Sequence, residues 1–269
     1  MPCENPESPY MTTGLLIIDP QNDFCDPDRG ALYVPGAEQD MERLASFITT
    51  RGGELDDIVI SLDSHQRMDI SHPLWWVNPE GIHPKPFTSI TPQHMDSGSW
   101  QAARESDQAR SAEYVRTLAA GNRYPHIIWP EHCIVGHWGH NVWPTLHRAL
   151  GEWEAKYQRR AHYVYKGTNE YTEHFSAIRA EVIDPEDKTT QVNDALLTRL
   201  EGVSTLYIAG EARSHCVANT VRDLAAAKPA LVSQMILLGN TTSDVPGFTA
   251  LGEAFVQELT QQGMREQHL

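Results

Sequence analysis

The sequence predicts an α/β protein in three layers, with helices on both faces of a largely parallel sheet of about six strands. Two observations predict this fold class. Short, continuous apolar runs alternate with segments of helical periodicity along most of the 269 residues. Several of those runs also end in a charged or polar residue, and the carboxyl ends of strands are where open parallel sheets carry their functional groups.

The elements follow in order from this pattern. Residues 14–19 are apolar up to Asp19 and predict a strand buried on both faces, and residues 58–63 predict a second strand that ends in Asp63. An amphipathic helix is expected between them, over residues 37–50, where two glycines stop it. Further strands are expected over 163–166, 205–210 and 234–238, and helices over 104–120, 138–157 (interrupted at Pro144), 191–200, 217–224 and 248–262.

The chain is expected to form a single domain over residues 12–269, preceded by a loose leader over 1–11. Between about 73 and 124 the periodicity fades into a segment rich in Pro and Trp, which we interpret as an insertion. A lid over the site or an oligomer contact, and a solvated insertion without a role, are equally compatible with this composition. We expect a homo-oligomer.

Charge and cysteine content narrow the functional class. The 21 Lys and Arg residues against 36 Asp and Glu give a net charge of −15, which argues against nonspecific binding to nucleic acid or to anionic membranes. No apolar run approaches the roughly 20 residues of a membrane span, and the first ten residues lack a signal-peptide core. Four widely separated cysteines without a C-x-x-C motif fit a reducing compartment, so a cytoplasmic location is expected.

Cys216 stands where a predicted strand passes into a predicted helix, a position that favours a thiolate. Asp19 and Lys166 end two other predicted strands and are expected at the same edge of the sheet. Asp19 can accept the thiol proton, and Lys166 can stabilise both negative charges. Taken singly, the three residues are equally typical of a buried cysteine, a helix-capping Asp and a Lys with a buried stem.

Asp63 and His65 form a second group just past a strand end. Carboxylate and imidazole are ligands for Zn²⁺, Mn²⁺ or Fe²⁺, and Asp69, His72 and His132 are candidates to complete the set. By spacing alone, a loop Asp bonded to the backbone beside a surface His is the favoured interpretation.

At these residues the sequence resembles the nicotinamidase branch of the isochorismatase-like cysteine hydrolases. Five segments carry the resemblance in the family's order: residues 18–24 (IDPQNDF), 63–65 (DSH), 129–133 (WPEHC), 166–169 (KGTN) and 210–216 (GEARSHC). They span most of the chain, and five segments in order indicate membership much more strongly than one.

The resemblance implies a catalytic triad of Asp19, Lys166 and Cys216. It also implies a cis peptide bond between Glu211 and Ala212, with the N–H groups of Ala212 and Cys216 facing the developing oxyanion. In this family the cysteine attacks a small amide, a thioester forms, ammonia leaves and water completes the hydrolysis.

The resemblance further implies a divalent metal, with Zn²⁺ expected ahead of Mn²⁺ or Fe²⁺, held by Asp63, His65 and His132. In nicotinamidases this metal orients the ring nitrogen. Asp69 or His72 stands where the family often has a further histidine. The residues expected to form the substrate pocket are Gln21, Phe24, Ser64, His72, Glu211 and His215.

Several of these pocket positions depart from the family pattern: Ser64 replaces an aromatic residue, Glu211 an apolar one, and His215 stands where an aromatic residue is frequent. The expected function is therefore metal-dependent hydrolysis of nicotinamide or a related small carboxamide. Hydrolysis of another small amide, of the carbamoyl or maleamate type, is an alternative, as is a non-catalytic protein that binds small ligands. The presence of Cys216 argues against the isochorismatase reaction, because those enzymes lack the nucleophile.

Overall fold

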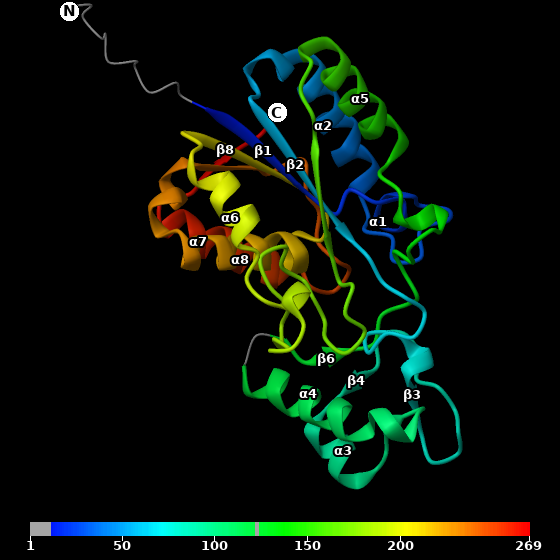
Figure 1. Cartoon of the computed structure of the whole chain (residues 1–269). Helices are drawn as coiled ribbons and strands as arrows, with labels where there is room; N and C mark the ends of the chain where they lie inside the picture. Colours follow the sequence, from blue (N-terminus) through cyan, green and yellow to red (C-terminus); the bar gives the residue numbers. More distant parts are fainter. Residues whose placement is uncertain (1–11, 122–123) are drawn as a thin grey trace, which may run out of the picture.

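The structure is a computed structural model that describes residues 12–121 and 124–269 (Figure 1). The expected leader over 1–11 lies outside the described residues. At the centre is a six-stranded sheet in the order β10-β9-β8-β1-β2-β7, in which neighbouring strands are parallel. Its strands are β1 (Thr13–Ile18), β2 (Asp57–Asp63), β7 (His162–Lys166), β8 (Thr205–Gly210), β9 (Met235–Leu238) and β10 (Arg265–Gln267).

The two central strands account for the apolar runs in the sequence. β1 and β8 pair from Thr13–Thr205 to Ile18–Gly210, and nearly all of their residues are buried. Side chains of both faces are therefore in the core, which is why these strands are continuously apolar rather than alternating. β10 is an exposed edge strand of charged and polar residues, and its sequence carries no strand pattern.

Helices cover both faces of the sheet, so the predicted three-layer α/β/α fold is confirmed (Figure 1). On one side lie α2 (Ala37–Arg51) and α5 (Pro144–Tyr157), which pack against each other, together with the short α1 (Asn22–Cys25). On the other lie α6 (Asp194–Glu201), α7 (Ala218–Ala227) and α8 (Thr249–Gln261). The helical region expected over 138–157 is interrupted near Pro144, as predicted: a 3₁₀ turn spans Trp138–His140, and α5 begins at Pro144 because the first turn of a helix does not need the missing N–H.

The segment expected as an insertion lies beyond the carboxyl ends of the strands (Figure 1). It has its own hydrophobic cluster, in which Trp75 and Trp76 are at most 1% exposed. The helix expected from residue 104 begins at Gln108, after a 3₁₀ turn. The elements of this region are β3 (Trp76–Val77), β4 (Ser89–Ile90), α3 (Pro92–Ser97), β5 (Gln101–Ala102), α4 (Gln108–Ala120) and β6 (His126–Ile127).

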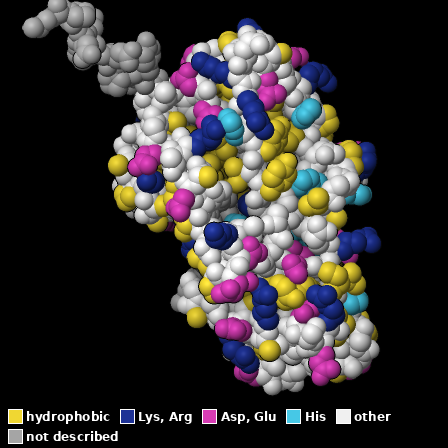
Figure 2. Space-filling model, viewed as in Figure 1, with side chains coloured by type: hydrophobic (Ala, Val, Ile, Leu, Met, Phe, Trp, Pro, Cys, Tyr) yellow, Lys and Arg dark blue, Asp and Glu magenta, His cyan; other side chains and the backbone are white. Residues whose placement is uncertain are grey.

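The surface is mixed in charge. On the face shown in Figure 2, Lys and Arg side chains are interspersed with Asp and Glu side chains rather than gathered in one patch. Across residues 12–121 and 124–269, none of the helices has the length and apolar character needed to cross a membrane.

Candidate active site and metal-ligand cluster

The carboxyl ends of three strands of the sheet bring Asp19, Lys166 and Cys216 together. Asp19 directly follows β1, Lys166 ends β7, and Cys216 lies between β8 and α7. The Lys166 Nζ lies 2.8 Å from Asp19 Oδ2 and 3.7 Å from Cys216 Sγ. All three residues are at most 5% exposed, so their charges interact with little solvent screening.

The chain reaches Cys216 through an unusual connection. Gly210 has φ of 116°, and a Cβ there would lie 2.0 Å from the carbonyl oxygen of Ile18, so no other residue fits beside β1. A π-helical turn over Arg213–Val217 follows, closed by a bond from Val217 N to Ala212 O of 3.3 Å. Cys216 thus lies in a π turn ahead of α7 and not in its first turn, and π turns are frequent at functional sites.

The expected cis bond between Glu211 and Ala212 is not present. The described residues contain no cis peptide bond, and the chain turns instead through Ala212, whose φ is 58°. A positive φ is uncommon outside glycine and places local strain next to the cysteine.

Asp19 and Lys166 are fixed by neighbouring strands. The Ser61 hydroxyl of β2 donates a 2.6 Å hydrogen bond to Asp19 Oδ1. The Lys166 ammonium also donates to Asp63 Oδ1 at 2.9 Å and to the carbonyl of His174 at 3.0 Å. One buried cation therefore joins the proposed nucleophile, its neighbouring base and the carboxylate of the metal-ligand cluster.

Burial and these contacts set the protonation states. Burial alone would lower the pKa of Lys166, but Asp19 and Asp63 outweigh it and hold that pKa well above its usual value. Burial raises the pKa of Asp19, and Lys166 opposes the rise only in part. Burial also raises the pKa of the Cys216 thiol well above its usual value, despite Lys166. The position of Cys216 before a helix and the nearby Lys166 both favour a thiolate, but desolvation acts in the opposite direction and exceeds the attraction of the lysine.

Asp63, His65 and His132 form a buried cluster that could hold a metal ion. One ligand atom from each residue lies within 4.8 Å of the other two. The Asp63 Oδ2 is 3.1 Å from His65 Nε2 and 3.4 Å from His132 Nε2. One carboxylate and two imidazoles that converge in this way are a donor set typical of zinc.

The second nitrogen of each imidazole supports this interpretation. His65 Nδ1 is 2.9 Å from Asp69 Oδ2, and His132 Nδ1 is 2.9 Å from the carbonyl oxygen of Pro130. Carboxylate and carbonyl oxygens accept here, so each Nδ1 donates and each Nε2 is directed at Asp63 as a possible ligand. Burial alone would lower the pKa of His65, but Asp63 and Asp69 outweigh burial and hold that pKa well above its usual value.

The two further candidates lie around this cluster and not among its converging ligand atoms. Asp69 contacts the far side of His65. His72 Nε2 is 3.3 Å from His132 Nδ1, and its own Nδ1 is 3.1 Å from the carbonyl of Gln66. Burial lowers the pKa of His72 to about 3, so it is neutral. Both residues are placed to orient ligands.

A cavity of about 20 Å³ lies between the triad and this cluster. Its volume is about that of one water molecule. The lining side chains come from both functional groups and from an apolar wall: Phe24, Leu32, Asp63, Trp129, His132, Glu173, Phe175, Ala212, His215, Cys216 and Val245.

Phe24 and His215 thus line the cavity as expected, whereas the other four predicted pocket residues do not. The side-chain amide of Gln21 holds the backbone of Asp63: its Nε2 donates to the Asp63 carbonyl at 2.8 Å, and its Oε1 accepts from the Asp63 N–H at 2.7 Å. The Ser64 hydroxyl lies 2.9 Å from His140 Nε2, and His72 supports His132. Glu211 is fully buried, and burial raises the pKa of its carboxyl well above its usual value.

Several cavity residues were not identified from the sequence. Trp129 lies in a quoted motif, but nothing in its spacing indicates a wall; its ring meets His215 edge-on at 5.4 Å. Glu173 and Phe175 follow Lys166 in a loop with no periodicity. The sequence offers one signal for Glu173, its position seven residues after the motif lysine Lys166. Phe87 of the insertion contacts Trp129 edge-on at 6.0 Å, so this region reaches the cavity wall.

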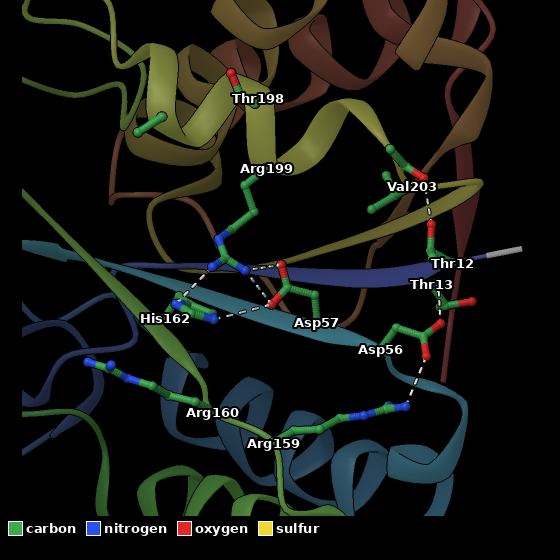
Figure 3. A pocket seen from close by; sticks show the side chains of 12 residues that line it. Thr12, Thr13, Asp56, Asp57, Arg159, Arg160, His162, Thr198, Arg199 and Val203 are labelled. Carbon is green, nitrogen blue, oxygen red and sulfur yellow. Dashed lines mark hydrogen bonds and ion pairs between the residues drawn. The ribbon is translucent and has the colours of Figure 1, made fainter. Parts of the chain in front are cut away.

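A much larger hollow, of about 750 Å³, lies at the opposite end of the strands (Figure 3). Most of its charged side chains are bonded to one another. Arg199 pairs with Asp57 at 2.9 Å and contacts His162 at 3.1 Å, and Arg159 pairs with Asp56 at 3.1 Å. We call this surface the arginine groove; it is lined by Thr12, Thr13, Asp56, Asp57, Arg159, Arg160, His162, Ala195, Thr198, Arg199, Gly202 and Val203.

Comparison with known proteins gave two curated relatives. The chain is 25% identical over 212 residues to the nicotinamidase of Escherichia coli, covering 78% of this chain and 74% of the relative. It is 25% identical over 251 residues to the nicotinamidase of Acinetobacter baylyi, covering 93% and 90%. No protein-family model matches the chain.

Solved structures share the fold. A crystal structure of the yeast nicotinamidase bound to the inhibitor nicotinaldehyde matches with a TM-score of 0.64 at 19% identity, over 96% of this chain and 100% of that one. The pyrazinamidase of Pyrococcus horikoshii in complex with zinc matches with a TM-score of 0.53 at 17% identity, over 96% and 99%. The sequence relatives and the shared fold confirm the resemblance to the nicotinamidase branch of the isochorismatase-like hydrolases.

Proposed function

We propose that this protein is a hydrolase of the carbon–nitrogen bond of small carboxamides, with Cys216 as nucleophile and nicotinamide as the first substrate to test. The observation that supports this most strongly is the position of Lys166. Its ammonium lies within 3.7 Å of a buried thiol and within 2.9 Å of two buried carboxylates, beside a cavity that the thiol lines. Burying these charges does not help to pack a core, whereas a cysteine hydrolase requires a thiol, a proton acceptor and a cation close together.

The reaction begins with proton transfer from the Cys216 thiol to Asp19, while Lys166 stabilises the forming thiolate. Because the resting thiol is protonated, this transfer accompanies attack. The sulfur bonds to the amide carbon, and the backbone N–H groups of Ala212 and Cys216 are the candidates to stabilise the oxyanion. Asp19 returns the proton to the amide nitrogen, the carbon–nitrogen bond breaks and ammonia leaves. Asp19 then takes a proton from water as the water attacks the thioester. When the carbon–sulfur bond breaks, Asp19 returns that proton to the sulfur, so the acid leaves and the thiol is restored.

The residues fit a divalent cation, zinc above all, held by Asp63, His65 and His132. When bound, such an ion supplies a Lewis-acid contact that orients a polar atom of the substrate. Asp69 and the Pro130 carbonyl hold the two imidazoles in the ligating tautomer, and Lys166 neutralises the other oxygen of Asp63. The cluster would thereby place the substrate relative to Cys216.

The cavity wall favours a neutral, flat substrate. Phe24, Trp129, Phe175 and His215 surround it, and burial keeps the pKa of His215 near 4, so this ring is uncharged. Of the described residues, none of those lining the cavity is Lys or Arg. An amide that carries its own carboxylate, as maleamate-type compounds do, would find no cationic side chain there. Because the cavity has room for about one water molecule, the wall must move to admit an aromatic ring.

The direct test is ammonia release from a panel of nicotinamide, pyrazinamide, benzamide and a maleamate-type amide, with the Cys216→Ser variant as control. We expect turnover of the heteroaromatic amides and loss of turnover in the variant. Turnover of the maleamate-type amide alone would replace the proposed substrate, and no turnover of any amide would leave a ligand-binding protein. A cytoplasmic location and a homo-oligomer remain predictions, the second checked by light scattering.

A further inference from the structure

The insertion reaches the wall of the small cavity through Phe87. The side chain of Phe87 is 56% exposed, and its ring meets the Trp129 ring edge-on, with 6.0 Å between the centroids. Trp129 is 4% exposed and lines the cavity, whereas Phe87 does not line it. Phe87 therefore contacts Trp129 from the solvent side of the wall.

The backbone fixes Phe87 next to Trp129. β4 and β6 form an antiparallel ribbon (Figure 1), and its pairing continues beyond both strands. The Phe87 N–H donates to the Ile128 carbonyl, and the Ile128 N–H donates to the Thr88 carbonyl at 2.9 Å. Trp129 follows Ile128 directly, so the ribbon sets where the two rings lie. Phe87 has a φ of 68°, which is strained for a bulky residue, and strain of this kind clusters at ligand sites.

The Trp129 side chain is held in the wall by ring contacts alone. Its indole N–H has no hydrogen-bond partner among the residues that the structure describes, whereas the buried indoles of Trp75 and Trp76 donate at 3.0 and 2.7 Å. His215 is fixed through its Nδ1, which lies 2.9 Å from the Ser214 hydroxyl. Because moving Trp129 breaks no hydrogen bond of its side chain, it is the ring of this wall that can swing without leaving a polar group unpaired.

Substrate entry requires a movement of this kind. The closed cavity of about 20 Å³ holds about one water molecule, so an aromatic ring reaches Cys216 only after the wall has opened. Outside the cavity lining, the Trp129 ring contacts Phe87 at 6.0 Å and Phe248 at 6.3 Å. Phe248 packs against the main hydrophobic core, whereas more than half of the Phe87 side chain is exposed. Phe87 is therefore the outer contact that can yield when Trp129 moves.

We propose that Phe87 is a specificity-determining residue: its ring closes Trp129 over the cavity, and the gap that opens when the two rings part selects amides by width. A single planar ring passes through a narrow gap, whereas a substituted or fused ring system requires Phe87 to move farther. The inference rests on the proposed function for the identity of these amides. It makes part of the insertion a lid, and lids of this kind restrict which molecules reach the reacting atoms.

The test measures how fast a narrow and a wide reagent, iodoacetamide and N-phenylmaleimide, alkylate Cys216 in a Cys3→Ser background. Each rate constant is read at the Cys216 peptide by mass spectrometry and divided by that of a free thiol. Phe87→Ala keeps the Cβ, and with it the backbone strain, but removes the ring. It should accelerate N-phenylmaleimide about three- to tenfold, as expected for the loss of one aromatic contact, and iodoacetamide less than about twofold.

Ile82→Ala is the matched control and should leave both rates unchanged, because Ile82 is an exposed apolar residue of the same insertion that does not line the cavity. Phe87→Trp enlarges the ring and should slow N-phenylmaleimide about threefold. Thermal unfolding midpoints show which variants are folded, and the tryptophan variant keeps the proposal falsifiable if Phe87→Ala does not fold.

Equal acceleration of both reagents by Phe87→Ala, no acceleration, or the same acceleration in Ile82→Ala would overturn the role of Phe87. A Cys216 that neither reagent labels in any variant would overturn it as well. Alkylation requires no turnover, so the proposed function is scored separately, by ammonia release from nicotinamide with the wild-type protein. Ammonia release with unchanged labelling rates would reject the lid and keep the hydrolase.

Discussion

The two ends of the central sheet carry hollows of very different character. At the amino ends of the strands, the arginine groove encloses about 750 Å³, yet its charged side chains are largely bonded to one another (Figure 3). At the carboxyl ends, a cavity of about 20 Å³ is lined by Glu173 and His215, each with a side-chain atom that has no partner within the described residues. Buried polar atoms without a hydrogen-bond partner in the protein therefore indicate a ligand site better than the volume of a hollow does.

The parallel topology explains the difference. In a parallel sheet, the turns that lead from the strands into the covering helices all lie at one edge. Irregular backbone in these turns can direct a side chain toward a shared site. Asp19 and Ala212 both adopt positive φ at that edge, and Cys216 lies in a π turn. At the groove end, backbone hydrogen bonds join the starts of β1 and β2, such as the bond from Asp56 N to the Thr13 carbonyl oxygen at 2.8 Å.

The largest expected contrast is between two aspartates at opposite ends of the sheet. Asp19→Asn removes the proton acceptor for Cys216 and should lower kcat for amide hydrolysis by about 10³-fold, within the usual range for general base catalysis. Asp57→Asn in the arginine groove should leave kcat within twofold. Steady-state ammonia release measures kcat for both variants. Equal losses of kcat would contradict the assignment of the active site to the carboxyl ends of the strands.

Two histidines extend the comparison to metal binding. His132→Ala deletes one of the three converging ligands and should leave the purified protein with less than a tenth of the wild-type metal content after dialysis against a weak chelator. His162→Ala, in the groove, should retain full metal content. Elemental analysis per chain is the measurement. A wild-type protein without metal, active in the presence of a chelator, would assign Asp63 and His65 a structural role.

A smaller effect is expected from Asp69→Asn, which leaves all three ligand side chains in place. The amide still accepts from His65 Nδ1 but loses the negative charge that favours a cation at Nε2. We expect metal affinity to fall 10- to 100-fold, the usual cost of altering such a partner. Competition with a fluorescent chelator reports this independently of activity, and a variant with the affinity of the wild type would limit Asp69 to packing.

The smallest effect is expected in the arginine groove itself. Arg199→Ala removes the ion pair with Asp57 and the contact with His162, but the arginine is partly exposed and solvent screens the pair. The free energy of unfolding should change by less than about 1 kcal/mol, and kcat/KM should be unchanged. A tenfold change in kcat/KM would show that the groove communicates with the site across the sheet.

Much of this arrangement could be predicted from the sequence, and the exceptions share a cause. Apolar runs predicted the ends of β1, β2 and β8 to within a residue or two. The charged residues that end the predicted strands indicated that Asp19 and Lys166 lie at the same edge of the sheet. Glu173 and Trp129 reach the cavity from loops without periodicity, so only tertiary structure places them. Glu211 follows a strand end as a site residue does, yet its side chain is buried and does not line the cavity. Strand ends predict which edge carries the site, and the backbone conformation after each strand decides which side chains enter it.

The central claim, that Cys216 at the small cavity is the nucleophile, is tested most directly by covalent labelling with iodoacetamide in a Cys3→Ser background, followed by peptide mass spectrometry and residual activity. Cys25 and Cys133 are fully buried, and burial raises the pKa of both thiols with no lysine bonded to either sulfur among the described residues. The account predicts one equivalent of label, on Cys216, with activity lost in step and saturating nicotinamide slowing both. Label on Cys133 first, or full activity with Cys216 alkylated, would contradict it.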